Sequence, residues 1–179
     1  MKILTGIYKG RNIKTAPTGI RPTKAIVRAA VFNILGDLVI DASVLDIFAG
    51  TGAMGIEALS RGARFCVFIE KDPHVLFKNI KMLKLQKQVR VIKQDFRPGL
   101  KKIKDMNFDI VFIDPPYQRR YLTEVLKILL FLNLITKGSV VVAEYSGFNL
   151  PSIPEEYSII KTKRYGETIV SFLKLKESE

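Results

Sequence analysis

A chain of 179 residues with 47% apolar side chains is long enough for one domain with a sizeable core and too apolar to remain disordered. A single cysteine excludes an internal disulfide, a single histidine argues against a zinc cluster, and no apolar stretch is long enough to span a bilayer. The 29 basic residues outnumber the 17 acidic ones, and the net charge of +12 indicates a polyanionic partner, nucleic acid before membrane. We therefore expect a cytoplasmic monomer that binds nucleic acid and no metal.

The first 40 residues are predicted to form a small extension, a β-hairpin followed by a helix, ahead of a main domain at 41–179. Residues 2–8 and 12–15 flank Lys9-Gly10-Arg11, and residues 23–35 place their apolar side chains on one helical face. No acidic residue precedes Asp37, whereas seven basic residues do: Lys2, Lys9, Arg11, Lys14, Arg21, Lys24 and Arg28. This acid-free segment favours contact with phosphates. Lysines at 78, 81, 84 and 87 share a later helical face, which we interpret as a solvated surface.

From residue 44 onward, short β-rich runs alternate with helical patterns, which is typical of βαβ units around a parallel sheet. Strands are expected at 44–47, 65–69, 89–93, 108–113 and 139–143, and helices at 52–60, 73–85, from about 98, and at 121–131. The last two β runs, 157–163 and 168–175, are joined by only four residues, so they predict a hairpin and one antiparallel strand.

A glycine-rich loop follows the first of these strands. Gly50, Gly52 and Gly55 fit the pattern G-x-G-x-x-G, which lets the backbone turn tightly and lie close to a ligand. Glu70 follows about 20 residues later, at the end of the next strand, where an acid that binds a ribose belongs. These features alone match a nicotinamide dinucleotide site equally well.

Asp46 separates the two kinds of cofactor site. Its carboxylate, four residues before the first glycine, would repel a pyrophosphate but suits a ligand that carries positive charge, such as the ammonium and sulfonium of S-adenosylmethionine. Asp95, just beyond the third strand, could accept a hydrogen bond from the adenine amino group, and Phe96 could cover the adenine ring. Acids at three neighbouring strand ends therefore favour S-adenosylmethionine.

The sequence Asp114-Pro115-Pro116-Tyr117 ends the fourth strand of the core and is suited to an exocyclic base amine. Asp114 and the Pro115 carbonyl could each accept one N–H, which would turn the nitrogen lone pair toward the methyl group. The prolines fix the direction of that carbonyl, and Tyr117 offers a face on which an extruded base can stack. This arrangement predicts methyl transfer to the amine of a nucleobase.

The chain resembles the RsmD-like family of 16S rRNA guanine-N2 methyltransferases along essentially its whole length. The motifs that carry the resemblance are G-x-Y-K-G-R, RPT, VRAAVFNIL, LDIFAGTGAMGIEALSRGA, FIEKD, QDF, DIVFIDPPY and RYGETIVSFL. The resemblance implies a Rossmann-like class I fold, in which an N-terminal hairpin and helix precede a seven-stranded, mostly parallel sheet with one antiparallel strand. It also implies methyl transfer from S-adenosylmethionine to N2 of one guanine of 16S rRNA, in the small ribosomal subunit or an assembly intermediate.

We expect three sets of site residues, partly from the strand ends and partly from the resemblance. The cofactor-binding set is Asp46, Ala49, Gly50, Thr51, Gly52, Glu70, Lys71, Asp95 and Phe96. The catalytic set is Asp114, Pro115, Pro116 and Tyr117. The substrate-binding set is Arg21, Thr23, Arg28 and Tyr117.

Two alternatives keep the same fold with another activity. A DNA methyltransferase acting on adenine N6 or cytosine N4 would use the same Asp-Pro-Pro-Tyr motif, although little chain is left for a domain that recognises a DNA target. A nucleic-acid-binding assembly factor without catalysis would not need an intact Asp114. Outside the site, Cys66 is interpreted as a small core residue, and Glu57 is expected to face solvent.

Overall fold

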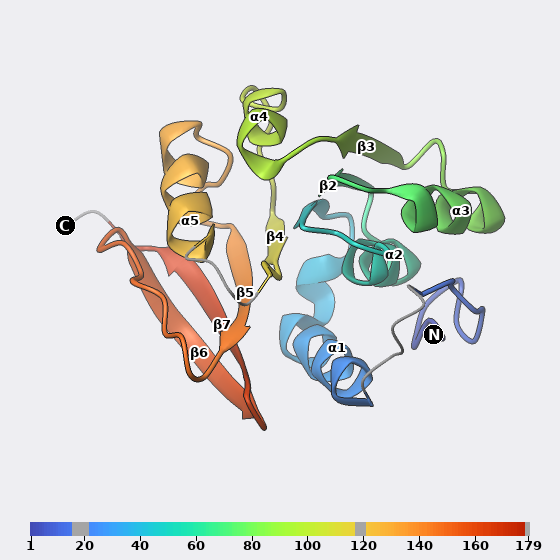
Figure 1. Ribbon diagram of the computed structural model, residues 1–179, viewed down its shortest axis with the longest axis horizontal. Coiled ribbons are helices and arrows are strands. Elements are labelled where there is room, and N and C mark those ends of the chain that lie inside the picture. Colours follow the sequence, from blue (N-terminus) through green and yellow to red (C-terminus); the bar gives the residue numbers. More distant parts are fainter. Residues whose placement is uncertain (16–21, 117–120, 178–179) are drawn as a thin grey trace.

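The computed structural model describes residues 1–15, 22–116 and 121–177, and it contains one seven-stranded sheet between two layers of helices (Figure 1). The strands are β1 (Ser43–Ile47), β2 (Phe65–Glu70), β3 (Val89–Lys93), β4 (Ile110–Ile113), β5 (Val140–Ser146), β6 (Tyr157–Tyr165) and β7 (Thr168–Leu175). The helices are α1 (Pro22–Leu35), the 3₁₀ helix η1 (Gly36–Val39), α2 (Ala53–Ser60), α3 (His74–Leu83), α4 (Phe96–Lys101) and α5 (Tyr121–Phe131).

The strand order is β3-β2-β1-β4-β5-β7-β6, and β7 runs antiparallel to both of its neighbours, β5 and β6. The chain builds outward from β1 to β3 and then returns to add β4 on the other side of β1. Ligands of such sheets bind at the carboxyl ends of the strands where the order reverses, which here lies between β1 and β4. The predicted Rossmann-like α/β fold is confirmed.

The central strands β1, β2 and β4 are buried on both faces, because successive side chains point to opposite sides and helices cover each side. On one face, Val44 and Phe68 join a core that also contains Val31 of α1 and Ile56 of α2. On the other face, strand residues such as Leu45 and Val67 share a second core with Leu100 of α4 and Leu126 of α5. Figure 1 shows these helices on the two sides of the sheet.

Several element boundaries differ from those expected by two residues or more, among them the starts of α4 and β4 and the end of β5. Helix α4 begins at Phe96 and not near Pro98, because the Asp95 carboxylate accepts the Arg97 N–H and caps the helix two residues earlier. Strand β4 begins at Ile110, two residues later than expected. Strand β5 continues to Ser146, because pairing with β7 extends it beyond its last partner on β4.

The N-terminal extension forms a hairpin with a single antiparallel bridge between Lys2 and Asn12. Ile3 and Ile13 are buried in the same hydrophobic core as α1 and α2, so the extension and the sheet share apolar packing. The division into two units at residue 40 stays a prediction. Over the described ranges, no helix is long and apolar enough to cross a membrane.

Candidate active site

In the glycine loop between β1 and α2, the residue at position 52 has to be a glycine. Gly52 has a φ of +81°, and a Cβ placed there would lie 2.4 Å from the Leu76 Cδ1. Gly50 also has a positive φ, +54°, and the preceding Ala49 donates its N–H to the Ile69 carbonyl over 3.2 Å. The loop is thus held against the end of β2 at the switch point, with Thr51 between its two glycines.

Glu70 ties this loop to the end of β2. One carboxylate oxygen accepts the Gly50 N–H over 2.7 Å, and the other accepts the Asp72 N–H over 3.0 Å. The carboxylate therefore fixes the direction of the loop backbone as well as standing where a ribose-binding acid was expected. Contact with a ribose stays a prediction.

Asp46 is buried beneath the loop and accepts the N–H of Gly55, in the first turn of α2, over 2.9 Å. Burial raises the pKa of Asp46 to about 7, against the opposing effect of the Gly55 N–H, and the charges of Asp114 and Glu70 raise it further. Three carboxylates from β1, β2 and the loop after β4 thus act on the same small volume. A cationic ligand would relieve their mutual repulsion.

Lys71 and Asp95 form an ion pair across the ends of β2 and β3, with the Lys71 Nζ 3.1 Å from a carboxylate oxygen. Partial burial alone would raise the pKa of Asp95, but the Arg97 N–H and the Lys71 ammonium outweigh it and hold that pKa below its usual value. Asp95 is consequently a carboxylate at neutral pH and can accept hydrogen bonds.

An aromatic cluster beside Asp95 includes two rings that the sequence analysis did not single out. Phe96 is only 2% exposed and lies 5.1 Å from Phe48 and 5.2 Å from Tyr121, between ring centroids. Phe48 and Tyr121 are half-buried, stack with centroids 6.0 Å apart, and leave more of their surface accessible than Phe96 does. In the sequence, Phe48 directly precedes Ala49 of the expected cofactor-binding set, and this position could have identified it as a residue of the site.

The Asp-Pro-Pro motif stands beside the glycine loop. Ile113, the last residue of β4, pairs with Ile47 of β1, so Asp114 and Phe48 leave the sheet side by side. Asp114 is half-buried, Pro115 is buried and Pro116 is exposed. The expected contacts of Tyr117 and Arg21 lie outside the described residues. Thr23 lies in the first turn of α1, and its expected substrate contact stays a prediction.

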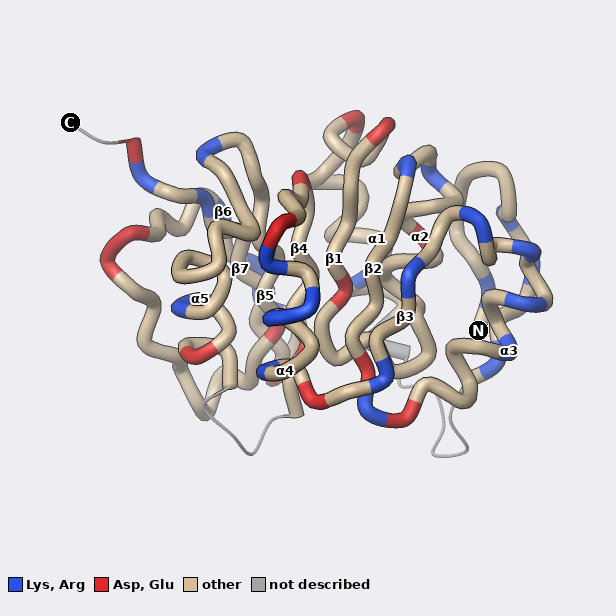
Figure 2. Tube along the Cα trace, turned by 90° about the horizontal axis from the view of Figure 1, so that it is seen from above, with Lys and Arg blue, Asp and Glu red and all other residues tan. Residues whose placement is uncertain are grey.

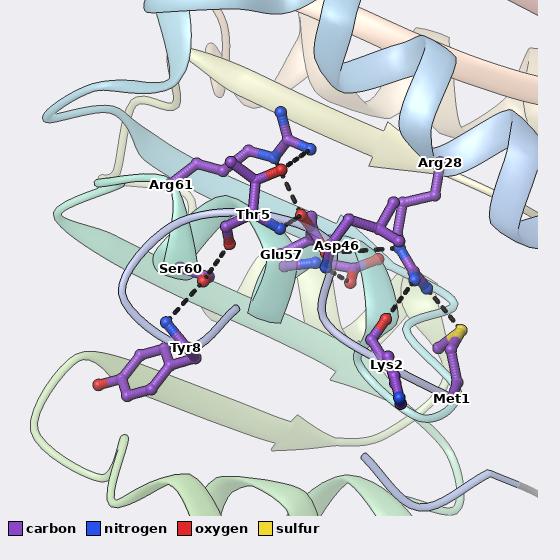
Figure 3. A network of polar contacts seen from close by, with 11 residues as sticks. Met1, Lys2, Thr5, Tyr8, Arg28, Asp46, Glu57, Ser60 and Arg61 are labelled. Atoms are coloured by element: carbon purple, nitrogen blue, oxygen red, sulfur yellow. Dashed lines mark hydrogen bonds and ion pairs between the residues drawn. The ribbon is translucent and has the colours of Figure 1, made fainter. Parts of the chain in front are cut away.

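Arg28 is brought not to the sheet's carboxyl edge but to the contact between the extension and α2 (Figure 3). It is buried, donates to the Lys2 carbonyl over 2.7 Å and to the Met1 sulfur, and lies 3.5 Å from a Glu57 oxygen. Its expected substrate contact stays a prediction, and its present contacts are structural.

Glu57 is 1% exposed, so the expectation that it faces solvent was wrong. Its carboxylate accepts the N–H groups of Leu4 and Thr5 over 2.9 and 3.1 Å and the Arg61 Nε over 3.0 Å. Figure 3 shows this carboxylate at the centre of the polar network. It therefore anchors the hairpin to α2.

Asn79 of α3 also contributes contacts that the sequence analysis missed. Its buried side chain accepts the Lys14 N–H over 2.7 Å and donates to the carbonyls of Lys14 and Thr51 over 3.0 and 2.9 Å. One amide thus joins the end of the hairpin to the glycine loop. A lone asparagine on a helix gives no sequence signal for such a role.

The groups at the carboxyl edge suit a cationic, adenosine-containing ligand better than a metal ion. Acceptors from Asp46, Glu70 and Asp95 surround a loop whose backbone can approach a ligand closely. Within residues 1–15, 22–116 and 121–177, no group of three or more His, Cys, Asp or Glu side chains could hold a metal ion. The carboxylate acceptors beside the glycine loop fit S-adenosylmethionine.

Comparison with known proteins assigns the chain to a family. Residues 1–174 match the family model described as conserved hypothetical protein 95. Ribosomal RNA small subunit methyltransferase D of Escherichia coli K12 is 35% identical over 172 residues, which cover 93% of this chain and 86% of that protein. The solved structure of the yhhF protein from Escherichia coli is 33% identical, with a TM-score of 0.88 and 98% of both chains covered.

The solved structure of SMU.776, a protein described as a methyltransferase and complexed with SAH, has the same fold at 14% identity, with a TM-score of 0.72 over 94% of this chain and 52% of that one. At such a low identity, this comparison shows a similar fold and says nothing about the activity of the chain. The match over residues 1–174 and the close relatives decide the assignment. The chain belongs to the conserved hypothetical protein 95 family, the RsmD-like family of S-adenosylmethionine-dependent methyltransferases.

Proposed function

We propose that this protein transfers a methyl group from S-adenosylmethionine to the exocyclic N2 amine of a guanine in 16S rRNA, within the small ribosomal subunit or an assembly intermediate. The observation that carries this proposal is the set of three acids at adjoining strand ends in a chain whose net charge is +12. Asp46, Glu70 and Asp114 make the pocket edge negative, as a sulfonium cofactor requires, while the rest of the surface favours a polyanion.

Each group at the edge has a defined task in this reaction. S-adenosylmethionine supplies an electrophilic methyl group on a positively charged sulfur. Asp114 and the Pro115 carbonyl accept the two N–H bonds of the amine and hold its lone pair toward that methyl group. With S-adenosylmethionine bound, the bond between the methyl carbon and the sulfur would break as the bond to the amine nitrogen forms, and the sulfur would leave as a neutral thioether. The Asp114 carboxylate would stabilise the positive charge on the amine and take up the proton that leaves.

The cofactor contacts follow from the same edge. In this proposal Glu70 accepts from the ribose and Asp95 from the adenine amino group, while Ala49, Gly50, Thr51 and Gly52 line the cofactor with the loop backbone. Lys71 holds Asp95 through its ion pair. Phe48 and Tyr121 provide apolar surface beside the adenine in addition to Phe96.

A basic surface next to the site supports an RNA substrate. Lys9 and Arg11 of the hairpin are exposed, and Arg11 donates to the Met82 carbonyl near the end of α3 over 3.1 Å, so the two elements adjoin. Four exposed lysines of α3 and the segment after it continue this surface: Lys78, Lys81, Lys84 and Lys87. Figure 2 shows the blue segments gathered around α3 and the N-terminus. The lysine face, interpreted from the sequence alone as a solvated surface, adjoins the basic hairpin in the structure, and in this proposal phosphate groups of an RNA bind to both.

The test is transfer of labelled methyl from S-adenosylmethionine to small ribosomal subunits that lack the modification. Protein-free 16S rRNA and duplex DNA serve as parallel substrates, and the labelled nucleoside is identified after digestion. We expect N2-methylguanosine from the ribosomal substrate. Asp114→Ala should lower kcat roughly 100- to 1000-fold, because the developing charge on the amine loses its acceptor.

The matched control is Asp105→Ala, which removes an exposed carboxylate after α4 and should leave kcat unchanged. Label found in adenine or cytosine of DNA would replace the proposal with a DNA methyltransferase. Measurable cofactor binding without transfer to any of the three substrates would contradict the proposal and favour a binding factor.

A further inference from the structure

Residues 147–150 form a loop after β5 that exposes two large apolar side chains, Phe148 (74% exposed) and Leu150 (71%). A single exposed apolar residue is normal on a protein surface, and Phe131 at the end of α5 is 84% exposed. The loop itself is held at both ends: the Gly147 N–H donates to the Glu167 carbonyl over 2.7 Å, and the Thr123 hydroxyl donates to the Ser152 carbonyl over 2.7 Å. Phe148 is therefore displayed from a fixed loop.

The loop stands beside the catalytic motif. Ile113, the last residue of β4, pairs with Ala143, and β5 continues for three more residues to Ser146. At about 3.3 Å per residue, the loop begins roughly 10 Å beyond the level at which Asp114 leaves the sheet. Thr123, which holds its far end, lies in the first turn of α5, the helix that follows the Asp-Pro-Pro-Tyr motif in the chain. Phe148 thus lies on the substrate side of the sheet.

A cation accompanies the exposed ring. The Arg164 Nε donates to the Gly166 carbonyl over 3.0 Å in the β6–β7 turn, and a Cβ added at Gly147 would lie 3.3 Å from the Arg164 Nη2. The guanidinium therefore lies against Gly147, where a side chain would crowd it. Lys163 is exposed one residue earlier, and residues 145–154 contain no acid.

Exposed aromatic rings with guanidinium and ammonium groups are the features by which proteins bind unpaired nucleotides, through stacking and phosphate contact. Sheet order puts this loop on the flank of β5, β7 and β6, whereas the basic hairpin packs on α2, on the flank of β1 and β2 (Figure 1). An RNA strand that delivers a base to Asp114 would therefore meet protein on both sides.

We propose that Phe148, Leu150 and Arg164 form a stacking surface for unpaired nucleotides that flank the target base. Phe148 and Leu150 take the faces of one or two bases, and Arg164 takes a neighbouring phosphate. The inference rests on the proposed function, because it assumes that the nucleic acid at Asp114 is single-stranded RNA.

The chain has no tryptophan, so a single tryptophan can report stacking directly. The fluorescence of Phe148→Trp should fall when an oligoadenylate of about 12 nucleotides, within the range of known single-strand sites, is added. Phe131→Trp is the matched control, because Phe131 is also largely exposed, 84% against 74% for Phe148, but ends α5 at the opposite edge of the sheet. Equal responses of the two variants, or none in Phe148→Trp, would overturn the inference.

Affinity separates stacking from charge. Phe148→Ala should weaken binding of the oligoadenylate about tenfold, within the roughly 5- to 150-fold range expected for one stacked base, and Phe148→Tyr should restore it. An abasic oligonucleotide of the same length has the same phosphates, so Phe148→Ala should leave its binding unchanged, whereas Arg164→Gln should weaken both. Equal losses for the two oligonucleotides in Phe148→Ala would overturn stacking.

Turnover shows whether the surface serves the reaction. With unmodified small subunits, Phe148→Ala should raise KM and leave both kcat and cofactor affinity unchanged, and Phe131→Ala should change none of them. A raised KM with subunits but unchanged oligoadenylate binding would overturn the RNA contact and indicate a protein partner at the loop. Methyl transfer by the unaltered protein tests the proposed function separately, so the two failures are distinguishable.

Discussion

At the scale of single residues, the protonation of Asp46 should control cofactor binding. Burial raises its pKa to about 7, so at acidic pH the group is neutral and cannot attract a cation. Bound S-adenosylmethionine favours the charged form and displaces the proton. We therefore expect the affinity for the cofactor to rise about tenfold per pH unit below pH 7 and to level off above it, as the loss of one proton requires.

Calorimetric titration with S-adenosylmethionine between about pH 5.5 and 8.5 would measure this dependence, and repeating it in buffers of different ionisation enthalpy would count the released proton. Asp46→Asn is the control: it keeps an acceptor for the Gly55 N–H but cannot titrate, so its affinity should be lower and independent of pH. A pH-independent affinity in the unaltered protein would show that Asp46 carries its charge throughout.

At the scale of elements, docking of the hairpin on α2 should depend on the charge of Glu57. Glu57→Gln keeps the shape of the side chain but leaves the buried Arg28 without its counter-charge. Removing one partner of a buried pair lowers the free energy of unfolding by about 3–5 kcal/mol, a large share of a typical total. Urea unfolding would measure this loss, and Glu155→Gln on the exposed loop before β6 should cause none. A loss below about 1 kcal/mol would indicate that water enters the network.

Most elements could be predicted from the sequence because their patterns are local. The alternation of buried strands and helices, the glycine loop and the closing hairpin all fall within a few residues of the expected positions. The contacts of Glu57 and Asn79 could not be predicted, because their hairpin partners lie 53 and 65 residues away in the chain. Glu57 was expected to face solvent from its helix, but the hairpin covers it.

At the scale of the whole molecule, the net charge of +12 should make RNA binding strongly salt-dependent. If about four phosphates are neutralised on a single strand, a rise from about 50 to about 200 mM salt lowers the affinity about 50-fold. Fluorescence anisotropy of a labelled oligoadenylate at several salt concentrations would give the slope. Arg164→Gln should reduce that slope by about 0.7, and Arg64→Gln, at the opposite edge of the sheet, should not; a flat dependence would exclude an electrostatic footprint.

Cys66 is the one thiol of the protein, and it lies in β2, next to β1, against Gly55 of α2. Burial raises the pKa of this thiol well above its ordinary value, so the folded molecule presents almost no thiolate to an alkylating reagent. Alkylation therefore has to wait until the sheet opens near its centre. The rate of Cys66 alkylation therefore reports how often the sheet opens. Slower alkylation in the presence of cofactor would mean that ligand binding makes opening less frequent, and the size of that decrease would report the affinity for the cofactor.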